Sequence, residues 1–362
     1  MKTRSKIMSG LTRLSLALGL MFLCTLPAAP AQAISLGDLG TVVQAGVAYA
    51  KIDKALNYYE NEGRNEYMEQ VKKEYGVNET PEANAMLEQV MSKLSGSIAA
   101  VDPSISAKPY NYFVNNETSF NAFCTLGHNL SVNIGAFNVL NYNEDELAVV
   151  IAHELGHGQK QHPLKGNRKS LTAAMAAEVF SGGSSSVAAK LAYNIGKAKL
   201  ITKPQEVEAD ELAFTYYTGA GYNIGAGAAV WERVLEKSGQ STGLNAFVGD
   251  LLNDHPTNVS RLAKYNQKIT DWSGGVVKVE DKTGAISVNG KSFYAPVAAA
   301  GMSAKERAYF IAGNLAAVYH NHQQSSGASS DGGTLYVGEQ PILTAAEGES
   351  VSDLQAKLQE IL

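Results

Sequence analysis

The spacing of apolar positions along the chain predicts a mostly helical protein with a few short strands. Apolar residues recur at helical spacing over residues 81–94, and Leu147–Ala152 is an apolar run typical of a buried helix. They alternate with polar residues over 110–114 and 276–294. Helical spacing marks one buried face of a helix, and strict alternation marks a half-buried strand. The pattern therefore predicts an α+β fold in which helices predominate.

Breaks in this pattern divide the first three quarters of the chain into further elements. Residues 34–75 are expected to be helical, and 120–137 reads as two short strands around Gly127. A helix is expected over 204–219, with a proline in its first turn and a glycine at its end. Residues 164–200 read as two Ala-rich helices around a Ser/Gly link, and two interpretations stay open: an ordinary helical hairpin, or a mobile cover over a cleft.

From about residue 274 the character of the chain changes. A strand meander over 276–294 is followed by a helix from Ser303, with the sequence of a capping box. A Ser/Gly-rich linker or loop over 323–333, a strand pair or one long strand over 334–344 and a closing helix over 350–362 follow. The expected organisation is a leader (1–33), a catalytic domain (34–272) and a small α+β module of unknown function (273–362), which is expected to recruit substrates or envelope proteins.

The strongest chemical signal is the pattern H-E-x-x-H at His153, Glu154 and His157. Asn143 and Glu146 before it have the spacing of a capping box, so a helix is expected to begin here. Residues i and i+4 share a helix face, so both imidazoles can reach one metal ion, and Zn²⁺ suits two imidazoles plus a carboxylate. Glu154 then flanks the metal, where a base that takes a proton from water must lie.

A third ligand is expected from the helix over 204–219. Glu206 and Asp210 lie one turn apart on the same face. Glu206 is expected to complete the three protein ligands of a catalytic zinc site, and Asp210 to accept a hydrogen bond from the outer nitrogen of a ligating histidine. Glu208 is the competing candidate, but it points away from that face. Without a third ligand, the motif would be a helix with two histidines satisfied in other ways.

Residues 1–33 have the features of a secretory signal peptide. A basic start precedes an apolar core, Leu14–Leu26, and an Ala-Gln-Ala cleavage site at 31–33. The alternative is a membrane anchor, but the core is too short to span comfortably, and no later stretch offers about 20 uninterrupted apolar residues. The mature chain is expected to be soluble and exported, to the periplasm or otherwise outside the cell.

The composition of the chain limits the classes of molecule that it is expected to bind. The chain has 362 residues, 45% of them hydrophobic, and a formal net charge of -5; loss of the four basic residues of the leader leaves 26 basic against 35 acidic residues, a charge of -9. This charge argues against nucleic acid and against attraction to an anionic membrane. Cys124 is then the sole cysteine, so no internal disulfide forms. It could be a zinc ligand or a nucleophile, but a small buried side chain is more typical.

Two histidine-containing segments are less specific. The segment 254–261 reads D-H-P-T-N-V-S-R, and alone His255 is typical of an ordinary loop histidine. His320 and His322 could bind a metal, but they lie near the end of a predicted helix, where a cation is favoured. The residues alone therefore assign no ligand role to these histidines.

Four motifs together make residues 75–269 resemble the M48 metallopeptidases. They are N-A-F at 121–123, H-E-L-G-H at 153–157, E-V-E-A-D at 206–210 and H-P-x-x-x-x-R at 255–261. The family includes CAAX prenyl endopeptidases, HtpX heat-shock proteases and soluble periplasmic enzymes of the BepA type. Two features depart from the family: Thr-Leu-Gly-His replaces the usual Leu-Pro-Gly-Gly after N-A-F-C, and the transmembrane helices of integral members are absent. The soluble exported branch therefore fits better.

The resemblance implies a gluzincin-type domain, mainly helical with a small sheet. It implies one zinc per chain on His153, His157 and Glu206, with Glu154 as general base.

The resemblance also implies that His255 and Arg261 lie beside the metal. There they would stabilise the oxyanion, or His255 would occupy the open metal position as a brake. It further implies that the strand at Leu130–Asn133 binds an extended polypeptide substrate by main-chain pairing.

Two functions remain open at this point. The first is a zinc endopeptidase that hydrolyses unfolded or misassembled envelope proteins. The second is a peptide-binding chaperone or assembly factor with a gated or mainly structural zinc site. Glu154 favours the first, because a pure binding protein has no need of a base at that position.

Overall fold

The computed structural model describes residues 36–180, 201–239 and 258–362. The predicted leader, the second half of the 164–200 segment and His255 lie outside these ranges. The described part is mainly helical with small sheets, so the predicted α+β fold is confirmed. None of its helices combines the length and the apolar composition that a membrane span requires.

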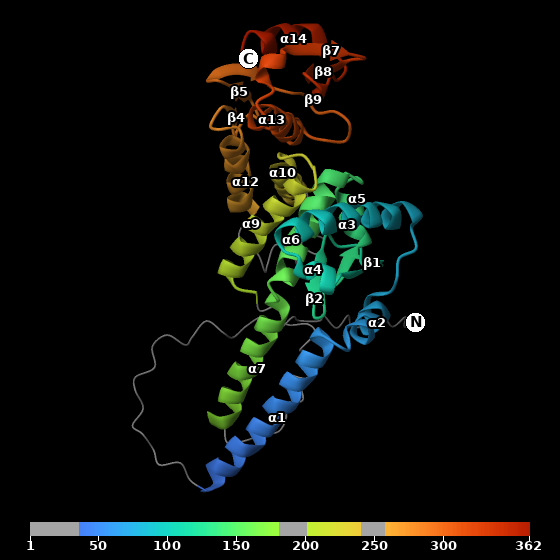
Figure 1. Ribbon diagram of the computed structural model, residues 1–362, viewed down its shortest axis with the longest axis vertical. Coiled ribbons are helices and arrows are strands. Elements are labelled where there is room, and N and C mark those ends of the chain that lie inside the picture. Colours follow the sequence, from blue (N-terminus) through green and yellow to red (C-terminus); the bar gives the residue numbers. More distant parts are fainter. Residues whose placement is uncertain (1–35, 181–200, 240–257) are drawn as a thin grey trace, which may run out of the picture.

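Two long helices project from the body of the molecule, as Figure 1 shows at its lower end. They are α1 (Leu36–Glu60) and α7 (His162–Phe180), and they run side by side. Arg168 of α7 joins them: its Nε lies 2.7 Å from Asp53 Oδ1, and its Nη2 donates to Asn57 Oδ1. The predicted helix over 34–75 is interrupted, because α1 ends at Glu60 and α2 (Arg64–Tyr75) starts after a short turn.

The first sheet has three short strands, β1 (Asn111–Asn115), β2 (Ala122–Thr125) and β3 (Asn129–Asn133). The two strands predicted around Gly127 are therefore confirmed. β3 lies in the middle, parallel to β1 and antiparallel to β2. The expectation that Leu130–Asn133 pairs with substrate is wrong, because both edges of that strand already pair with neighbours. The edge strands are β1 and β2.

The catalytic motif lies on α6 (Glu144–Gln159), which is buried over most of its length. Asn143 caps the helix, since its Oδ1 accepts from the Glu146 amide at 3.1 Å. The other half of the predicted capping box is absent: the Glu146 carboxylate lies 2.9 Å from Arg233 Nη2 instead of reaching back. The same guanidinium contacts Glu306 at 3.3 Å. Burial explains the difference, because a fully enclosed carboxylate is costly without a charged partner.

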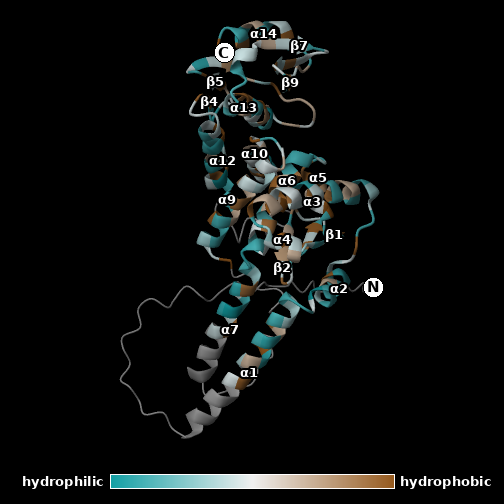
Figure 2. Cartoon of the chain, viewed as in Figure 1, coloured by the Kyte–Doolittle hydropathy of each residue, from teal (hydrophilic) through white to brown (hydrophobic). Residues whose placement is uncertain are grey.

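Helices pack around α6 on several sides, and Figure 2 shows hydrophobic residues gathered where they meet. The helix predicted over 204–219 is confirmed as α9, and α6 and α9 approach closely at Gly156. A methyl group there would meet the Ala209 carbonyl oxygen at 3.2 Å. The helices of this part of the chain are α3 (Pro81–Val101), α4 (Ser104–Ala107), α5 (Ile134–Val139), α9 (Lys203–Gly219), α10 (Ala226–Gly239) and α12 (Asn258–Trp272).

The C-terminal part forms two more three-stranded sheets and two helices, at the top of Figure 1. The predicted meander, capped helix, strand pair and closing helix are all confirmed. The predicted linker over 323–333 is wrong in part, because β7 lies within it and pairs with β8. The elements are β4 (Val277–Val279), β5 (Ile286–Val288), β6 (Lys291–Tyr294), α13 (Ala304–His320), the 3₁₀ helix η2 (Gln324–Ser326), β7 (Ala328–Asp331), β8 (Thr334–Val337), β9 (Gln340–Thr344) and α14 (Val351–Gln359).

One hydrophobic core runs through both parts of the chain. Buried side chains of α6, α10 and α12 belong to the same cluster as those of α13, β8 and α14. The division at residues 272 and 273 therefore stays a prediction.

Candidate metal centre

Two histidines of α6 and a glutamate of α9 come together in the interior. His153 and His157 lie one turn apart, and their Nε2 atoms are 3.0 Å from each other. Glu206 faces both: its Oε2 is 3.4 Å from His153 Nε2, and its Oε1 is 3.5 Å from His157 Nε2. All three side chains are buried, and their ligand atoms lie within 4.8 Å of one another.

These separations fit a tetrahedral metal ion. Bonds of about 2.0–2.1 Å at tetrahedral angles place neighbouring ligand atoms about 3.3 Å apart. The measured separations of 3.0–3.5 Å span that value. Two imidazole nitrogens and one carboxylate are also a donor set typical of catalytic zinc. The residues present therefore fit the zinc ion that the motif implies.

Asp210 lies behind His153, as the helix spacing predicts. Its Oδ1 is 2.9 Å from His153 Nδ1, on the ring edge opposite the Nε2 that faces Glu206. Burial alone would raise the pKa of Asp210, but Arg261 and His153 outweigh it and hold that pKa well below its usual range. Asp210 is therefore a carboxylate that can hold the Nδ1 proton of His153.

Arg261 acts on the same carboxylate. Its Nε lies 3.0 Å from Asp210 Oδ2, its Nη2 bonds Asp210 Oδ1, and its guanidinium carbon lies 3.7 Å over the ring of Trp231. Nη2 also lies 3.1 Å from His153 Nδ1. The resemblance placed Arg261 beside the metal as an oxyanion group, whereas its contacts are with the side of His153 that faces away from Glu206.

His157 has an outer partner that the sequence analysis did not single out. His162, at the start of α7, places its Nδ1 2.9 Å from His157 Nδ1. Its Nε2 lies 3.2 Å from Glu208 Oε2. Glu208, the competing ligand candidate, thus points to His162 rather than into the group formed by His153, His157 and Glu206. The spacing of five residues between the two histidines carried no signal, because it becomes a contact only when the chain turns back after α6.

Glu154 is held by the backbone of β2, one of the two edge strands of the first sheet. Its Oε2 accepts a hydrogen bond from the Cys124 amide at 3.0 Å. The Cys124 thiol is buried, and burial raises its pKa well above the ordinary value, so a small buried side chain describes it better than a nucleophile. Gly158 allows this contact, since a methyl group there would lie 2.8 Å from Cys124 Sγ.

The histidines near the end of α13 lie apart from this centre. The ring of His320 stacks on Trp272, with centroids 4.1 Å apart. Across the described ranges, His153, His157 and Glu206 form the set of side chains whose geometry could hold a metal ion. His255 lies outside those ranges.

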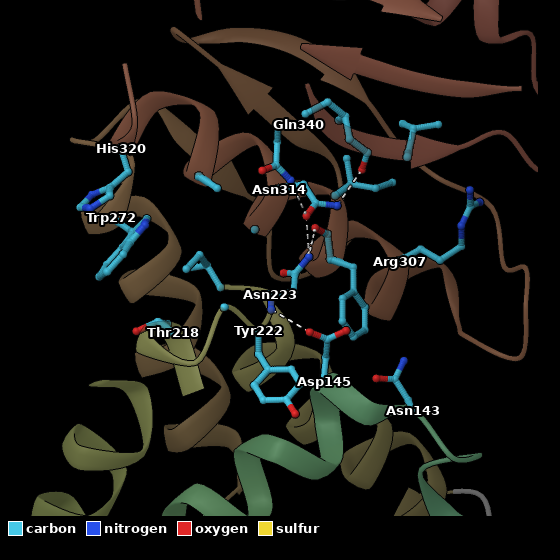
Figure 3. A pocket seen from close by; sticks show the side chains of 18 of the residues that line it. Asn143, Asp145, Thr218, Tyr222, Asn223, Trp272, Arg307, Asn314, His320 and Gln340 are labelled. Carbon is cyan, nitrogen blue, oxygen red and sulfur yellow. Dashed lines mark hydrogen bonds between the residues drawn. The ribbon is translucent and has the colours of Figure 1, made fainter. Parts of the chain in front are cut away.

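A cavity of about 1300 Å³ lies at the opposite end of α6, and Figure 3 shows it from close by. Asn223 links the walls of the cavity. The Asn223 backbone amide donates to Asp145 at 2.7 Å, and the Asn223 side-chain amide donates to Asn314 at 2.8 Å. Asn314 in turn donates to the Ile342 carbonyl of β9. These bonds join the catalytic helices to the C-terminal part. His153, His157 and Glu206 are not among the residues that line the cavity, so it is separate from the metal centre.

Comparison with known proteins agrees with the geometry of this centre. The model of peptidase family M48 matches residues 81–269. Among curated proteins, the chain is 28% identical over 155 residues to the mitochondrial metalloendopeptidase OMA1 of Arabidopsis thaliana, which covers 42% of this chain and 30% of that protein. It is 25% identical over 238 residues to a putative beta-barrel assembly-enhancing protease of Vibrio cholerae, a match that covers 62% of this chain and 46% of that protein.

It is also 29% identical over 171 residues to the metalloprotease LoiP of Escherichia coli, with 45% of this chain and 64% of that protein covered. The chain thus matches less than two thirds of the length of each of these relatives. The family match, in contrast, extends over more than half of the chain and contains the whole group of His153, His157 and Glu206. This chain belongs to peptidase family M48.

Proposed function

We propose that this chain is an exported zinc endopeptidase that cleaves unfolded or misassembled envelope proteins. The observation that carries the proposal is the buried group of His153, His157 and Glu206 at tetrahedral ligand spacing, with Glu154 directly after His153 on α6. A group that only stabilised the fold would need no additional carboxylate next to the metal ligands.

In this mechanism the protein holds three ligands and one base in fixed positions. Bound zinc would polarise the scissile carbonyl and make water more acidic. Glu154 takes the proton of the attacking water and passes it to the leaving amine. The Cys124 amide fixes the orientation of the Glu154 carboxylate. Asp210 keeps the proton of His153 on Nδ1, so that Nε2 is available as a ligand.

The substrate is proposed to be a polypeptide in extended conformation that pairs with β2. This strand is one of the two edges of the first sheet, and its Cys124 amide points toward Glu154 rather than toward β3. Added strands gain affinity from main-chain hydrogen bonds and therefore tolerate varied sequences. An unfolded chain offers such segments, whereas a folded protein has already paired them.

Location and partners belong to the same proposal. The leader sequence over 1–33 and the charge of -9 without it favour an exported chain, in the periplasm or otherwise secreted. The name of the relative from Vibrio cholerae, a beta-barrel assembly-enhancing protease, supports envelope proteins as the substrate class. The division into a catalytic domain (34–272) and a module (273–362) that recruits partners is part of this proposal.

The test is zinc content measured together with casein cleavage. The mature chain is compared with Glu154→Gln, with His255→Ala and with Glu211→Gln as a matched control, because Glu211 is an exposed carboxylate on α9 that pairs with Lys268. One zinc per chain and cleavage lost only in Glu154→Gln would support the peptidase. Cleavage that appears only in His255→Ala would mean a gated enzyme. Zinc without cleavage in any form would favour the chaperone, and no zinc would refute the ligand assignment.

A further inference from the structure

The two histidines of α6 are supported from behind in different ways. His153 meets a carboxylate directly, since Asp210 Oδ1 lies 2.9 Å from its Nδ1. His157 meets another imidazole, that of His162, at 2.9 Å between the Nδ1 atoms. The carboxylate on this side, Glu208, lies one step further out, 3.2 Å from His162 Nε2.

The turn between α6 and α7 creates this arrangement. The α6 helix ends at Gln159, and Gln161 adopts a left-handed backbone conformation with φ of 53°. Such a conformation costs about 1 kcal/mol or more for a residue other than glycine. It folds the start of α7 back against α6, so that the His162 side chain is 1% exposed and directed at His157.

The chemistry of imidazole fixes where the protons lie in this chain. A histidine that binds a metal through Nε2 is neutral and carries its one proton on Nδ1. His157 must then donate from Nδ1, and His162 must accept with its own Nδ1. The proton of a neutral His162 is consequently on Nε2, where it donates to Glu208 Oε2. Each contact has one donor and one acceptor, and the chain ends on a carboxylate.

We propose that His162 and Glu208 form a relay that orients His157 and holds it in the tautomer that leaves Nε2 available to the metal. This inference rests on the proposed zinc site. Both are positioning residues, because neither faces the ligand atoms of His153, His157 and Glu206. The relay is the counterpart of Asp210 behind His153, extended by one imidazole.

The relay makes a prediction about metal affinity. Removing the outer partner of a metal-bound histidine typically weakens metal binding about 10- to 100-fold. Glu208 is half exposed, so Glu208→Ala leaves the core intact. Its loss of zinc affinity is expected to be near 10-fold. His162→Ala removes a buried ring, and its loss of zinc affinity is expected to be near 100-fold. His162→Asn is expected to lie between wild type and His162→Ala, because an amide oxygen can take the place of the Nδ1 acceptor.

The experiment measures zinc dissociation constants of the whole mature chain by competition with a chromophoric chelator. The variants are Glu208→Ala, His162→Ala and His162→Asn, with Glu211→Ala as control, since Glu211 is an exposed carboxylate on the same helix that pairs with Lys268. Visible spectra of the Co²⁺-loaded proteins report changes in the coordination of the bound metal ion, to which His157 contributes. Thermal unfolding of the metal-free proteins reports any loss of packing.

Weaker zinc binding and altered Co²⁺ spectra in Glu208→Ala and His162→Ala, with an unchanged Glu211→Ala, would support the relay. Zinc binding within twofold of wild type in both relay variants would overturn it, even if their metal-free unfolding temperatures fell. An equal loss in Glu211→Ala would also overturn it, because the effect would then be one of net charge. A wild-type chain without stoichiometric zinc would refute the proposed function itself, and the relay with it.

Discussion

Replacing Arg261 with methionine distinguishes two roles for this residue. An oxyanion group acts on the transition state alone, whereas a partner of Asp210 acts on the metal-free protein and on metal binding. The contacts favour the second role, because Arg261 bonds both oxygens of Asp210 and its Nη2 lies 3.1 Å from His153 Nδ1. Methionine keeps much of the volume over Trp231 and removes the charge.

The magnitude follows from burial. Arg261 is 1% exposed and Asp210 is 5% exposed. Removing one partner of a buried ion pair destabilises a protein by about 3–5 kcal/mol, because the other charge is left without compensation. Loss of the cation over the Trp231 ring adds about 0.5–2 kcal/mol. We therefore expect Arg261→Met to lower the free energy of unfolding of the metal-free chain by about 3.5–7 kcal/mol.

The assay is urea unfolding of the metal-free chain, combined with zinc content and casein cleavage. The double variant Arg261→Met with Asp210→Asn completes a thermodynamic cycle, and its loss is expected to be smaller than the sum of the single losses. An ordinary surface substitution changes the free energy of unfolding by roughly 0.5 kcal/mol. A change no larger than that, with zinc retained and cleavage reduced, would refute this reasoning and restore the oxyanion role.

Three further predictions concern α6. Glu154→Gln should keep its zinc and lose cleavage by about 10²- to 10⁴-fold, the contribution of a general base. Burial, opposed by a neighbouring arginine, raises the pKa of Glu146 from 4.5 to about 7, so the folded state binds the extra proton and stability falls as pH rises through this window. Glu146→Gln should remove about 2–3 kcal/mol of that fall between pH 5 and pH 8, measured by urea unfolding. Gly158→Ala places a methyl group 2.2 Å from the Tyr110 hydroxyl and should cost about 1–3 kcal/mol and reduce cleavage, because β2 must move away from Glu154.

Two of these predictions have a matched control variant, and each has a result that would contradict it. Glu211→Gln should leave cleavage unchanged, whereas cleavage by Glu154→Gln within about tenfold of wild type would exclude Glu154 as the base. Equal pH slopes in wild type and Glu146→Gln would contradict the raised pKa. Gly96→Ala on α3 should not destabilise, since no atom lies within 4 Å of the added methyl group; a matching loss at Gly158 and Gly96 would argue against a steric cause.

The sequence by itself determined the features that depend on short-range geometry. The helical repeat places His153 and His157 on one face, and it places Asp210 one turn after Glu206. Helix caps and turn residues also act locally, which is why the capped helix of Ser303 and the hairpin strands around Gly127 were predicted correctly. These features need no knowledge of what packs against them.

The tertiary structure alone decided the contacts between distant positions. The Cys124 amide meets Glu154 across 30 residues of chain, and Arg261 meets His153 across 108. Sheet order placed β3 in the middle and left β1 and β2 as the edges. Strand patterning does not specify this order, because the period of two is the same in a central strand and in an edge strand.

Burial also overruled a local rule at Glu146. In an exposed helix its carboxylate would complete the capping box, but 87 residues later Arg233 provides a charged partner inside the core. A buried carboxylate gains more from that partner than from a backbone amide, so the long-range ion pair prevails over the local hydrogen bond. His162 follows the same logic, since its role depends on the turn that brings α7 back to α6.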